Sequence, residues 1–279
     1  MKTAIVTDST AYIPKELREK WNIYLIPLQV VFGTKVYQEE IDLSAGEFYE
    51  KVKTQALPTT SQPPIGQFVE LFEQLSKDYD AVISIHLSSG ISGTYQGAVT
   101  AGMMTGDIQV YPFDSEISCM VQGFYALEAA EMAERGEDAE VIMSKLEELK
   151  KTAHAYFMVD DLAHLAQGGR LSSAQAFIGS LLQVKPLLHF VDKVIVPFEK
   201  IRTRKKAMKR IADLLGEDAS SGGDYQAVII HANREEEAQE WQRSLAALYP
   251  NVDFSIGYFG AVIGTHLGEG SMGMGWMKK

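Results

Sequence analysis

A run of hydroxyl-bearing and glycine residues at positions 88–95, Ser-Ser-Gly-Ile-Ser-Gly-Thr-Tyr, has the composition of an anion-binding loop. It follows a β-branched run at residues 81–85 and precedes residues 95–104, which have the pattern of a helix. Glycines allow the backbone to approach a ligand closely, and the free N–H groups at a helix start attract an anion. Hydroxyl groups add donors without adding charge. The loop therefore predicts that hydroxyls and amides hold a small anionic group.

Three further segments carry hydroxyl or aspartate groups near the ends of expected strands. They are Asp8-Ser9-Thr10, Thr60-Ser61 and Asp114-Ser115. Each one alone is more simply explained as a helix cap, because serine and threonine favour that position. In open α/β sheets, however, such loops gather at one edge of the sheet, where ligands bind. We therefore expect all four segments to lie at one edge and to form a ligand site.

Other kinds of site have weaker support. A nucleotide site is disfavoured because the chain lacks both Gly-x-x-x-x-Gly-Lys-Ser/Thr and a Gly-x-Gly-x-x-Gly turn after the first strand. A hydrolase or phosphotransferase that uses Ser92 or Asp8 is an alternative, although Gly-x-Ser-x-Gly is absent and His86 is expected to pack within its strand. An interaction protein without a ligand is a third alternative. The one cysteine, Cys119, excludes an intrachain disulfide and a multi-cysteine metal site.

Two other polar segments could face such a ligand. His266 lies within residues 260–270, which are bracketed by glycines and are expected to form a tight turn. Its imidazole is either a directed donor or an ordinary hydrogen-bonded turn residue. Basic residues cluster at positions 202–210 of an otherwise acidic chain. They form either a solvated helix face or a contact for an acidic partner or the anionic end of the ligand.

The elements that must position these residues follow two patterns. Up to about residue 154, strand-like runs alternate with amphipathic helices, which favours a parallel sheet with helices on both faces. Residues 24–32 are expected to form one continuous apolar segment. From about residue 155, hairpins mix with helices; residues 177–182 are an apolar segment, and residues 254–259 a last strand pair. We expect an α/β protein with a Rossmann-like domain at residues 1–154 and a smaller mixed-sheet α/β domain at residues 155–279.

Composition and charge narrow the class of protein. The 279 residues are 46% hydrophobic and 23% charged, as in globular proteins. The net charge of −11 disfavours binding to nucleic acid or to an anionic membrane. No stretch approaches the roughly 18 apolar residues that span a bilayer, and the first residues enter a strand-like run without a signal-peptide pattern. These features predict a cytoplasmic protein.

Six motifs of this chain occur together, and in this order, in one known family. They are residues 7–10 (Thr-Asp-Ser-Thr), 58–63 (Pro-Thr-Thr-Ser-Gln-Pro), 86–95 (His-Leu-Ser-Ser-Gly-Ile-Ser-Gly-Thr-Tyr), 168–172 (Gly-Gly-Arg-Leu-Ser), 185–186 (Lys-Pro) and 264–268 (Gly-Thr-His-Leu-Gly). Over essentially its whole length the chain resembles the DegV family of bacterial fatty-acid-binding proteins, which are the substrate-carrying subunits of fatty acid kinase. One departure is Glu269, where many relatives have proline between the two glycines.

The resemblance implies a two-lobed fold that buries a long acyl chain between the lobes. The residues that it places at the fatty-acid carboxylate are Thr60, Ser92, Ser61, Gly93, His266 and Arg202. The residues that would dock the kinase subunit are Arg170, Arg202, Arg204 and Lys205.

The resemblance also implies what the protein does. It would bind a fatty acid of the palmitate or oleate class and present the carboxylate to a separate kinase subunit. That subunit would phosphorylate the fatty acid to an acyl phosphate for phospholipid synthesis. The chain itself would then be a carrier without catalysis, cofactor or metal, and it would contact membranes only transiently.

Overall fold

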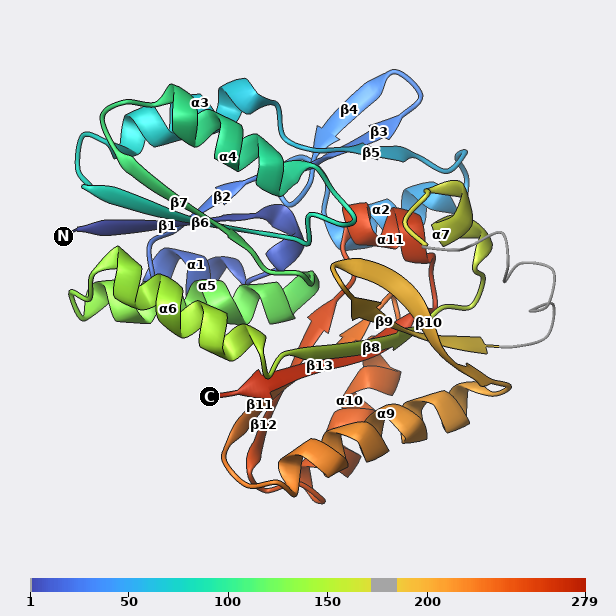
Figure 1. The fold of residues 1–279 in the computed structure, drawn as a ribbon. Coiled ribbons are helices and arrows are strands. Elements are labelled where there is room, and N and C mark those ends of the chain that lie inside the picture. The colour runs from blue at the N-terminus through green and yellow to red at the C-terminus, as the bar shows by residue number, and fades with distance from the viewer. Residues whose placement is uncertain (1, 172–184) are drawn as a thin grey trace.

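The structure of the protein, a computed structural model, describes residues 2–171 and 185–279 (Figure 1). The apolar segment expected at residues 177–182 lies outside these residues, as does Ser172 of the Gly-Gly-Arg-Leu-Ser motif. Within the described part, no helix is long and apolar enough to cross a membrane.

A four-stranded parallel sheet forms the N-terminal half. Its strands are β1 (Thr3–Asp8), β2 (Ile23–Ile26), β6 (Ala81–His86) and β7 (Gln109–Asp114), in the order β2-β1-β6-β7. Every residue of β1 and β6 is buried, as expected for central strands of a sheet that helices cover on both faces. The helices α3 (Ile65–Leu75) and α4 (Thr94–Met104) lie on one face, and α5 (Cys119–Glu134) and α6 (Ala139–Lys150) lie on the other (Figure 1). The predicted parallel sheet is confirmed.

The helix α5 lies between the two halves of the molecule. It packs against β1 and β6 of the parallel sheet and also against strands of the second sheet. Both sides of the helix are therefore covered, and residues all round it are buried, from Cys119 through Ala126 to Met132. Residues 119–126, the first half of the helix, are all buried, which is typical of a helix enclosed between two layers.

A six-stranded mixed sheet forms the C-terminal half. Its strands are β8 (His154–Met158), β9 (Lys185–Val191), β10 (Val194–Ile201), β11 (Tyr225–His231), β12 (Val252–Tyr258) and β13 (Met272–Lys278). They are arranged in the order β10-β9-β8-β13-β11-β12, and only the β11–β12 pair is parallel. The helices α9 (Arg204–Ala219) and α10 (Glu235–Ala246) cover the outer face of this sheet (Figure 1).

The C-terminal end of the chain differs from the sequence prediction. Residues 254–259 are not a strand pair but part of the single strand β12, and the expected turn at residues 260–270 contains the helix α11 (Ala261–Leu267). The chain then forms β13 in the middle of the mixed sheet, a strand that was not predicted. Glycine is depleted in strands, so Gly273 and Gly275 concealed it. They are needed there because a Cβ on Gly275 would lie 2.2 Å from Val121 Cγ2, and one on Gly273 would lie 2.7 Å from Phe157 Cβ.

A third, small sheet corrects two other predictions. It consists of β3 (Gln29–Phe32), β4 (Lys35–Gln38) and β5 (Thr59–Ser61), in the antiparallel order β4-β3-β5. The apolar segment 24–32 is therefore divided at Pro27, with β2 and β3 in different sheets. Thr60 lies inside β5, so the expectation of four polar loops at one edge of the parallel sheet is wrong for this segment.

The remaining helices are short. They are η1 (Ser9–Ala11), α1 (Lys15–Lys20), α2 (Ala45–Val52) and α7 (Ala163–Gln167). The helix α2 begins with a capping box, in which Ser44 Oγ accepts from the backbone N–H of Glu47 and the Glu47 carboxylate accepts from the backbone N–H of Ser44.

The largest hydrophobic core is continuous across both halves. It contains Ile5 of β1 and Ile85 of β6 together with Val228 and Ile230 of β11 and Phe259 after β12. The first strand of the six-stranded sheet along the chain is β8, which begins close to the predicted domain boundary at residues 154 and 155. The shared core, however, joins the two halves. The division into two domains stays a prediction.

Candidate functional site

An apolar cavity lies between the two halves. It holds about 850 Å³ of space outside the protein atoms, including the part that is open to solvent. The apolar side chains that line it come from both halves and are Leu28, Leu87, Ile91, Phe157, Leu165, Phe190, Ile195, Ile230, Phe259, Val262, Ile263, Leu267 and Met274.

The sequence did not identify these lining residues individually. Met103 and Met104, two large apolar residues, are 82% and 64% exposed at the end of α4. Leu187 and Leu188 are fully buried in the core. The cavity is lined instead by residues that have little in common along the chain, because it forms only where the two halves meet.

One end of the cavity is polar, and most of the predicted carboxylate-binding residues line it. We call this group the Thr60 site; its members are Thr60, Ser61, Ser92, Gly93, Arg170 and His266. Thr60 comes from β5, Ser92 and Gly93 from the loop between β6 and α4, and His266 from α11. The structure thus brings together five of the six residues that the resemblance implies, all except Arg202.

Thr60 and His266 are in direct contact. Thr60 Oγ1 lies 2.9 Å from His266 Nε2, although 206 positions separate the two residues along the chain. His266 Nδ1 is buried and has no hydrogen-bond partner among the described residues. A proton on Nδ1 would therefore be buried without an acceptor, so the arrangement favours the tautomer with the proton on Nε2. In that tautomer the imidazole donates to Thr60, and the threonine hydroxyl keeps its own proton for a ligand in the cavity.

His266 is uncharged near neutral pH. Burial, together with the charges of Arg170 and His164, lowers the pKa of His266 to about 4. An anion bound beside His266 would have the opposite effect and would raise this pKa.

The loop that carries Ser92 is held in a compact turn. The backbone N–H groups of Ile91 and Ser92 donate to the Ser88 carbonyl at 3.1 and 3.2 Å. Ser92 Oγ lies 2.9 Å from Thr94 Oγ1 at the first residue of α4. Gly93 lies against the Gln62 side chain, next to Ser61, so a Cβ at this position would displace the Gln62 amide. The loop thus places a hydroxyl and a helix N-terminus beside the polar end of the cavity, where both favour an anion.

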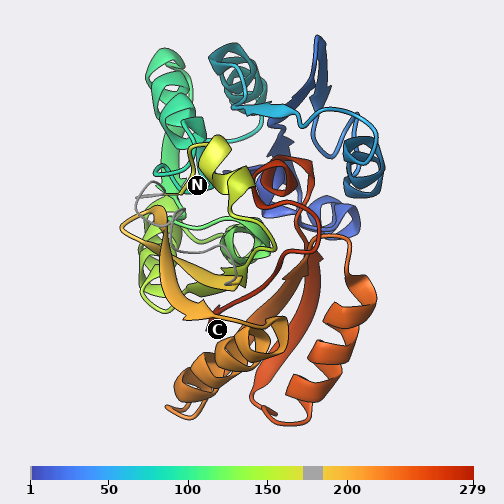
Figure 2. The same ribbon diagram turned by 90° about the vertical axis from the view of Figure 1, so that its right-hand side faces the viewer.

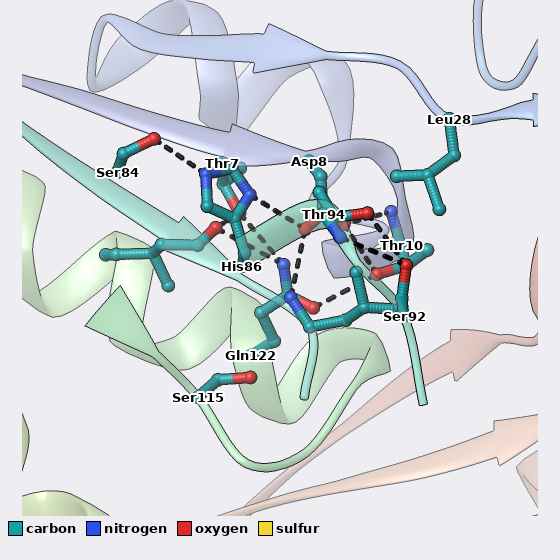
Figure 3. Close-up of polar contacts among 12 residues, drawn as sticks. Thr7, Asp8, Thr10, Leu28, Ser84, His86, Ser92, Thr94, Ser115 and Gln122 are labelled. Carbon is teal, nitrogen blue, oxygen red and sulfur yellow. Dashed lines mark hydrogen bonds and ion pairs between the residues drawn. The ribbon is translucent and has the colours of Figure 1, made fainter. Parts of the chain in front are cut away.

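A second polar cluster lies under this loop, and we call it the Asp8 network (Figure 3). Its members are Thr7, Asp8, Thr10, Ser84, His86 and Gln122, and all of them are fully buried. Asp8 Oδ1 accepts from the backbone N–H and the hydroxyl of Thr10 at 3.0 and 2.6 Å. Asp8 Oδ2 accepts from the backbone N–H of Leu87 at 2.9 Å and lies 3.0 Å from His86 Nδ1. His86 Nε2 lies 2.7 Å from Ser84 Oγ.

The Asp8 network resembles a catalytic relay in composition but not in accessibility. Its serine, histidine and aspartate are 0% exposed, and none of them lines the cavity. Both oxygens of Asp8 are occupied, which gives this residue a structural role between β1 and the end of β6. Gln122, which sequence reasoning missed, extends the network from α5 by donating to Thr7 Oγ1 at 3.2 Å. Its signal in the sequence is a polar residue within the first half of α5, residues 119–126, which is otherwise apolar.

The basic residues expected to dock a partner do not form one group. Arg170 lies at the cavity, where its Nε donates to the Ile91 carbonyl at 3.2 Å. Arg202 is exposed in the bend before α9 and is not among the described cavity-lining residues, so the structure does not place it at the proposed carboxylate site. Arg204 forms two bonds to the Glu237 carboxylate, at 2.7 and 2.8 Å, and ties α9 to α10. Lys205 is exposed on the same helix.

Among the described residues, no group of three or more histidine, cysteine, aspartate or glutamate side chains could hold a metal ion. Cys119 lines the cavity, and burial raises the pKa of its thiol to about 12. A thiol with so high a pKa is a poor nucleophile at neutral pH.

The fold and the cavity together define a class: an α/β protein with a parallel and a mixed sheet that enclose an apolar cavity with hydroxyl groups at one end. The chain belongs to the DegV family, since it matches the family model, described as "Uncharacterised protein, DegV family", over residues 2–279. It is 66% identical over 281 residues to Protein DegV of Bacillus subtilis (strain 168), with 100% of each chain covered.

Solved structures of two relatives share this fold. One is DegV from Bacillus subtilis, described as a fatty acid binding protein, with a TM-score of 0.95, 65% identity and 100% of each chain covered. The other, from Thermus thermophilus, is described as showing fatty acid binding of a DegV family protein; its TM-score is 0.92 and its identity 30%, again with 100% of each chain covered. The expected α/β fold and the resemblance to this family are confirmed.

Proposed function

We propose that this protein binds a long-chain fatty acid, with the acyl chain in the cavity and the carboxylate at the Thr60 site. The observation that carries the proposal is the contact between Thr60 and His266 at the polar end of an otherwise apolar cavity. The relatives described as fatty acid binding proteins support the same choice of ligand.

The energetics of such a ligand suit the cavity. Each buried CH₂ group contributes about 0.8 kcal/mol, so a chain of the palmitate or oleate class can bind tightly through its tail alone. A buried carboxylate must keep its hydrogen bonds. The hydroxyls of Thr60 and Ser92 are the neutral donors for it, and the Arg170 guanidinium at the same end favours the anionic form electrostatically.

The same proposal assigns the protein a carrier role. A separate kinase subunit would phosphorylate the bound carboxylate to an acyl phosphate that feeds phospholipid synthesis, as the family resemblance implies. The geometry gives little support to the alternative that this chain is itself a hydrolase or phosphotransferase. The described contacts of Ser92 include no histidine base, and both oxygens of Asp8 are occupied inside the core.

Mass spectrometry of the protein purified from a bacterial host tests the proposal. We expect the native mass to exceed the denatured mass by one fatty acid, which denaturation releases. The variant with both Thr60→Val and Ser92→Ala should carry this excess in a smaller fraction of its molecules while it stays folded. A native mass equal to the chain mass, with no uptake of added palmitate or oleate, would overturn the proposal. So would hydrolysis of an ester by the isolated protein that Ser92→Ala abolishes.

The kinase step needs a separate assay. With ATP and a fatty acid kinase subunit, the loaded protein should give an acyl phosphate that hydroxylamine traps as the hydroxamate. Fatty-acid binding without any acyl phosphate would leave the carrier without this partner and would contradict that part of the proposal.

A further inference from the structure

We propose that Lys193 and Asp114 are positioning residues for the Ser92 loop: the tip of the β9–β10 hairpin clamps this loop in the conformation that presents Ser92 to the ligand. The inference rests on the proposed function, because the fatty-acid carboxylate is the group that Ser92 would meet. It concerns two residues that do not line the cavity themselves.

The first observation is a chain of hydrogen bonds from the hairpin to the loop. Lys193 Nζ lies 2.9 Å from Asp114 Oδ2 at the end of β7. The Asp114 carboxylate in turn accepts from Ser89, at 3.0 Å from the backbone N–H and at 2.5 Å from the hydroxyl. Asp114 is 7% exposed, so little water competes for these bonds. The lysine charge is therefore connected through one carboxylate to the residue three positions before Ser92.

The second observation is a direct backbone contact between the same two segments. Ser88 Oγ donates to the Lys193 carbonyl at 2.6 Å. Gly90 packs so closely on the hairpin that a Cβ there would lie 2.3 Å from the Lys193 carbonyl oxygen. Both parts of Lys193 thus hold the turn from Ser88 to Gly90: the backbone carbonyl holds it directly, and the side chain holds it through Asp114.

The third observation is the backbone conformation of the hairpin tip. Asp192 and Lys193 connect Val191 to Val194 with φ values of 47° and 73°, as in a two-residue type I′ turn. Such turns favour glycine at the second position, because a side chain there costs backbone strain. The lysine is therefore not the residue that the turn itself prefers, and strain of this kind is often retained where a side chain has a function.

The hairpin also links the clamp to the ligand. It lies at one edge of the six-stranded sheet and reaches towards the N-terminal half (Figure 2). Phe190 and Ile195, on either side of its tip, line the cavity. A hairpin that stays closed over the acyl chain therefore also keeps the Ser92 loop in place.

The substitution Lys193→Gly separates this role from a structural one. It relieves the strain at φ 73° and keeps the carbonyl that accepts from Ser88, but it removes the ammonium group. We expect the free energy of unfolding to stay level or to rise, while fatty-acid affinity falls roughly tenfold, which corresponds to about 1.4 kcal/mol. A residue with a purely structural role would change both quantities in the same direction.

Two further variants complete the test. Gly90→Ala should weaken binding through the backbone clash, without any change of charge. Lys209→Met is the matched control, because it removes a lysine–aspartate pair of the same 2.9 Å length on the exposed face of α9, and it should leave affinity unchanged. Affinity and dissociation rate are measured with a fluorescent fatty acid and by competition with palmitate. Wild-type affinity for Lys193→Gly would overturn this inference, whereas failure of the unsubstituted protein to bind palmitate would overturn the proposed function instead.

Discussion

The Asp8 network and the Thr60 site contain similar side chains but differ in how many of their hydrogen-bonding groups lack a partner. In the Asp8 network each carboxylate oxygen already has two donors, and every member is sealed from solvent. At the Thr60 site the hydroxyls face a cavity, and His266 Nδ1 has no partner among the described residues. Residue type therefore does not identify the functional cluster here. The functional cluster is identified by hydrogen-bonding groups that lack a partner and lie next to an apolar cavity.

We expect the largest effect on stability from the removal of the Asp8 carboxylate. Asp8→Ala leaves the backbone N–H groups of Leu87 and Thr10 buried without their acceptor. Each such group costs about 1–3 kcal/mol, so we expect the free energy of unfolding to fall by roughly 3 kcal/mol or more. Urea denaturation measures the change. A variant as stable as the unsubstituted protein would show that the Asp8 network is not structural.

Substitution at the Thr60 site should have the reverse profile. For Thr60→Val combined with Ser92→Ala, we expect fatty-acid affinity to fall roughly 100-fold, because two charge-assisted hydrogen bonds are lost. Stability should change by only about 1 kcal/mol, since neither hydroxyl is fully buried. Isothermal titration with palmitate and thermal unfolding measure the two quantities. Thr60→Ser keeps the hydroxyl and should retain most of the affinity; if it binds as weakly as Thr60→Val, the hydroxyl is not the group that matters.

The pH dependence of folding stability tests the state of His266 at the Thr60 site. The pKa of this residue is about 4 in the folded protein against 6.5 in the unfolded chain, so the unfolded state takes up the proton first as pH falls. Its contribution to stability is therefore complete above pH 6.5 and is lost between pH 6.5 and 4. Between pH 7 and 5 the unsubstituted protein should lose about 2 kcal/mol relative to His266→Gln.

The difference between these two proteins is the quantity to measure, because Glu39 acts in the opposite direction. Burial raises the pKa of Glu39 to about 7, which favours the folded state as pH falls through that value. Glu39 is present in both proteins, so its contribution cancels. A pH-independent difference between them would mean that His266 is not held neutral by the site.

The smallest effect is expected at Arg202. Arg202→Gln should leave fatty-acid affinity within about twofold, because the side chain is exposed and not placed at the cavity. Arg170→Gln, the matched substitution at the Thr60 site, should weaken binding. Titration of both variants with palmitate decides which arginine serves the carboxylate, and equal losses would restore Arg202 to the site.

Local patterns in the sequence predicted much of the first half. The strands β1 and β6 are fully buried apolar runs, and β7 is rich in apolar residues, so all three are recognisable in the sequence. The Ser92 loop follows directly after β6. The second half was harder. The strand β13 is not recognisable in the sequence because it contains Gly273 and Gly275. The need for glycine at these positions is visible only in the folded structure, where Phe157 and Val121 pack against them.

The site shows the same limit. Thr60 and His266 meet through a small sheet and a seven-residue helix, and neither element has a clear local pattern. The resemblance assigns Arg170 and Arg202 to kinase docking, and Arg202 also to the carboxylate. The structure places Arg170 at the cavity and Arg202 in the exposed bend before α9, a difference that no local sequence pattern shows.

The measurement that tests the central claim most directly is the ¹³C NMR spectrum of palmitate labelled at its carboxyl carbon and bound to the protein. The account predicts one bound carboxyl resonance that Ser92→Ala and Thr60→Ser each shift and that Arg202→Gln leaves in place. A bound resonance that neither hydroxyl substitution moves would place the carboxylate elsewhere and contradict the assignment of the Thr60 site.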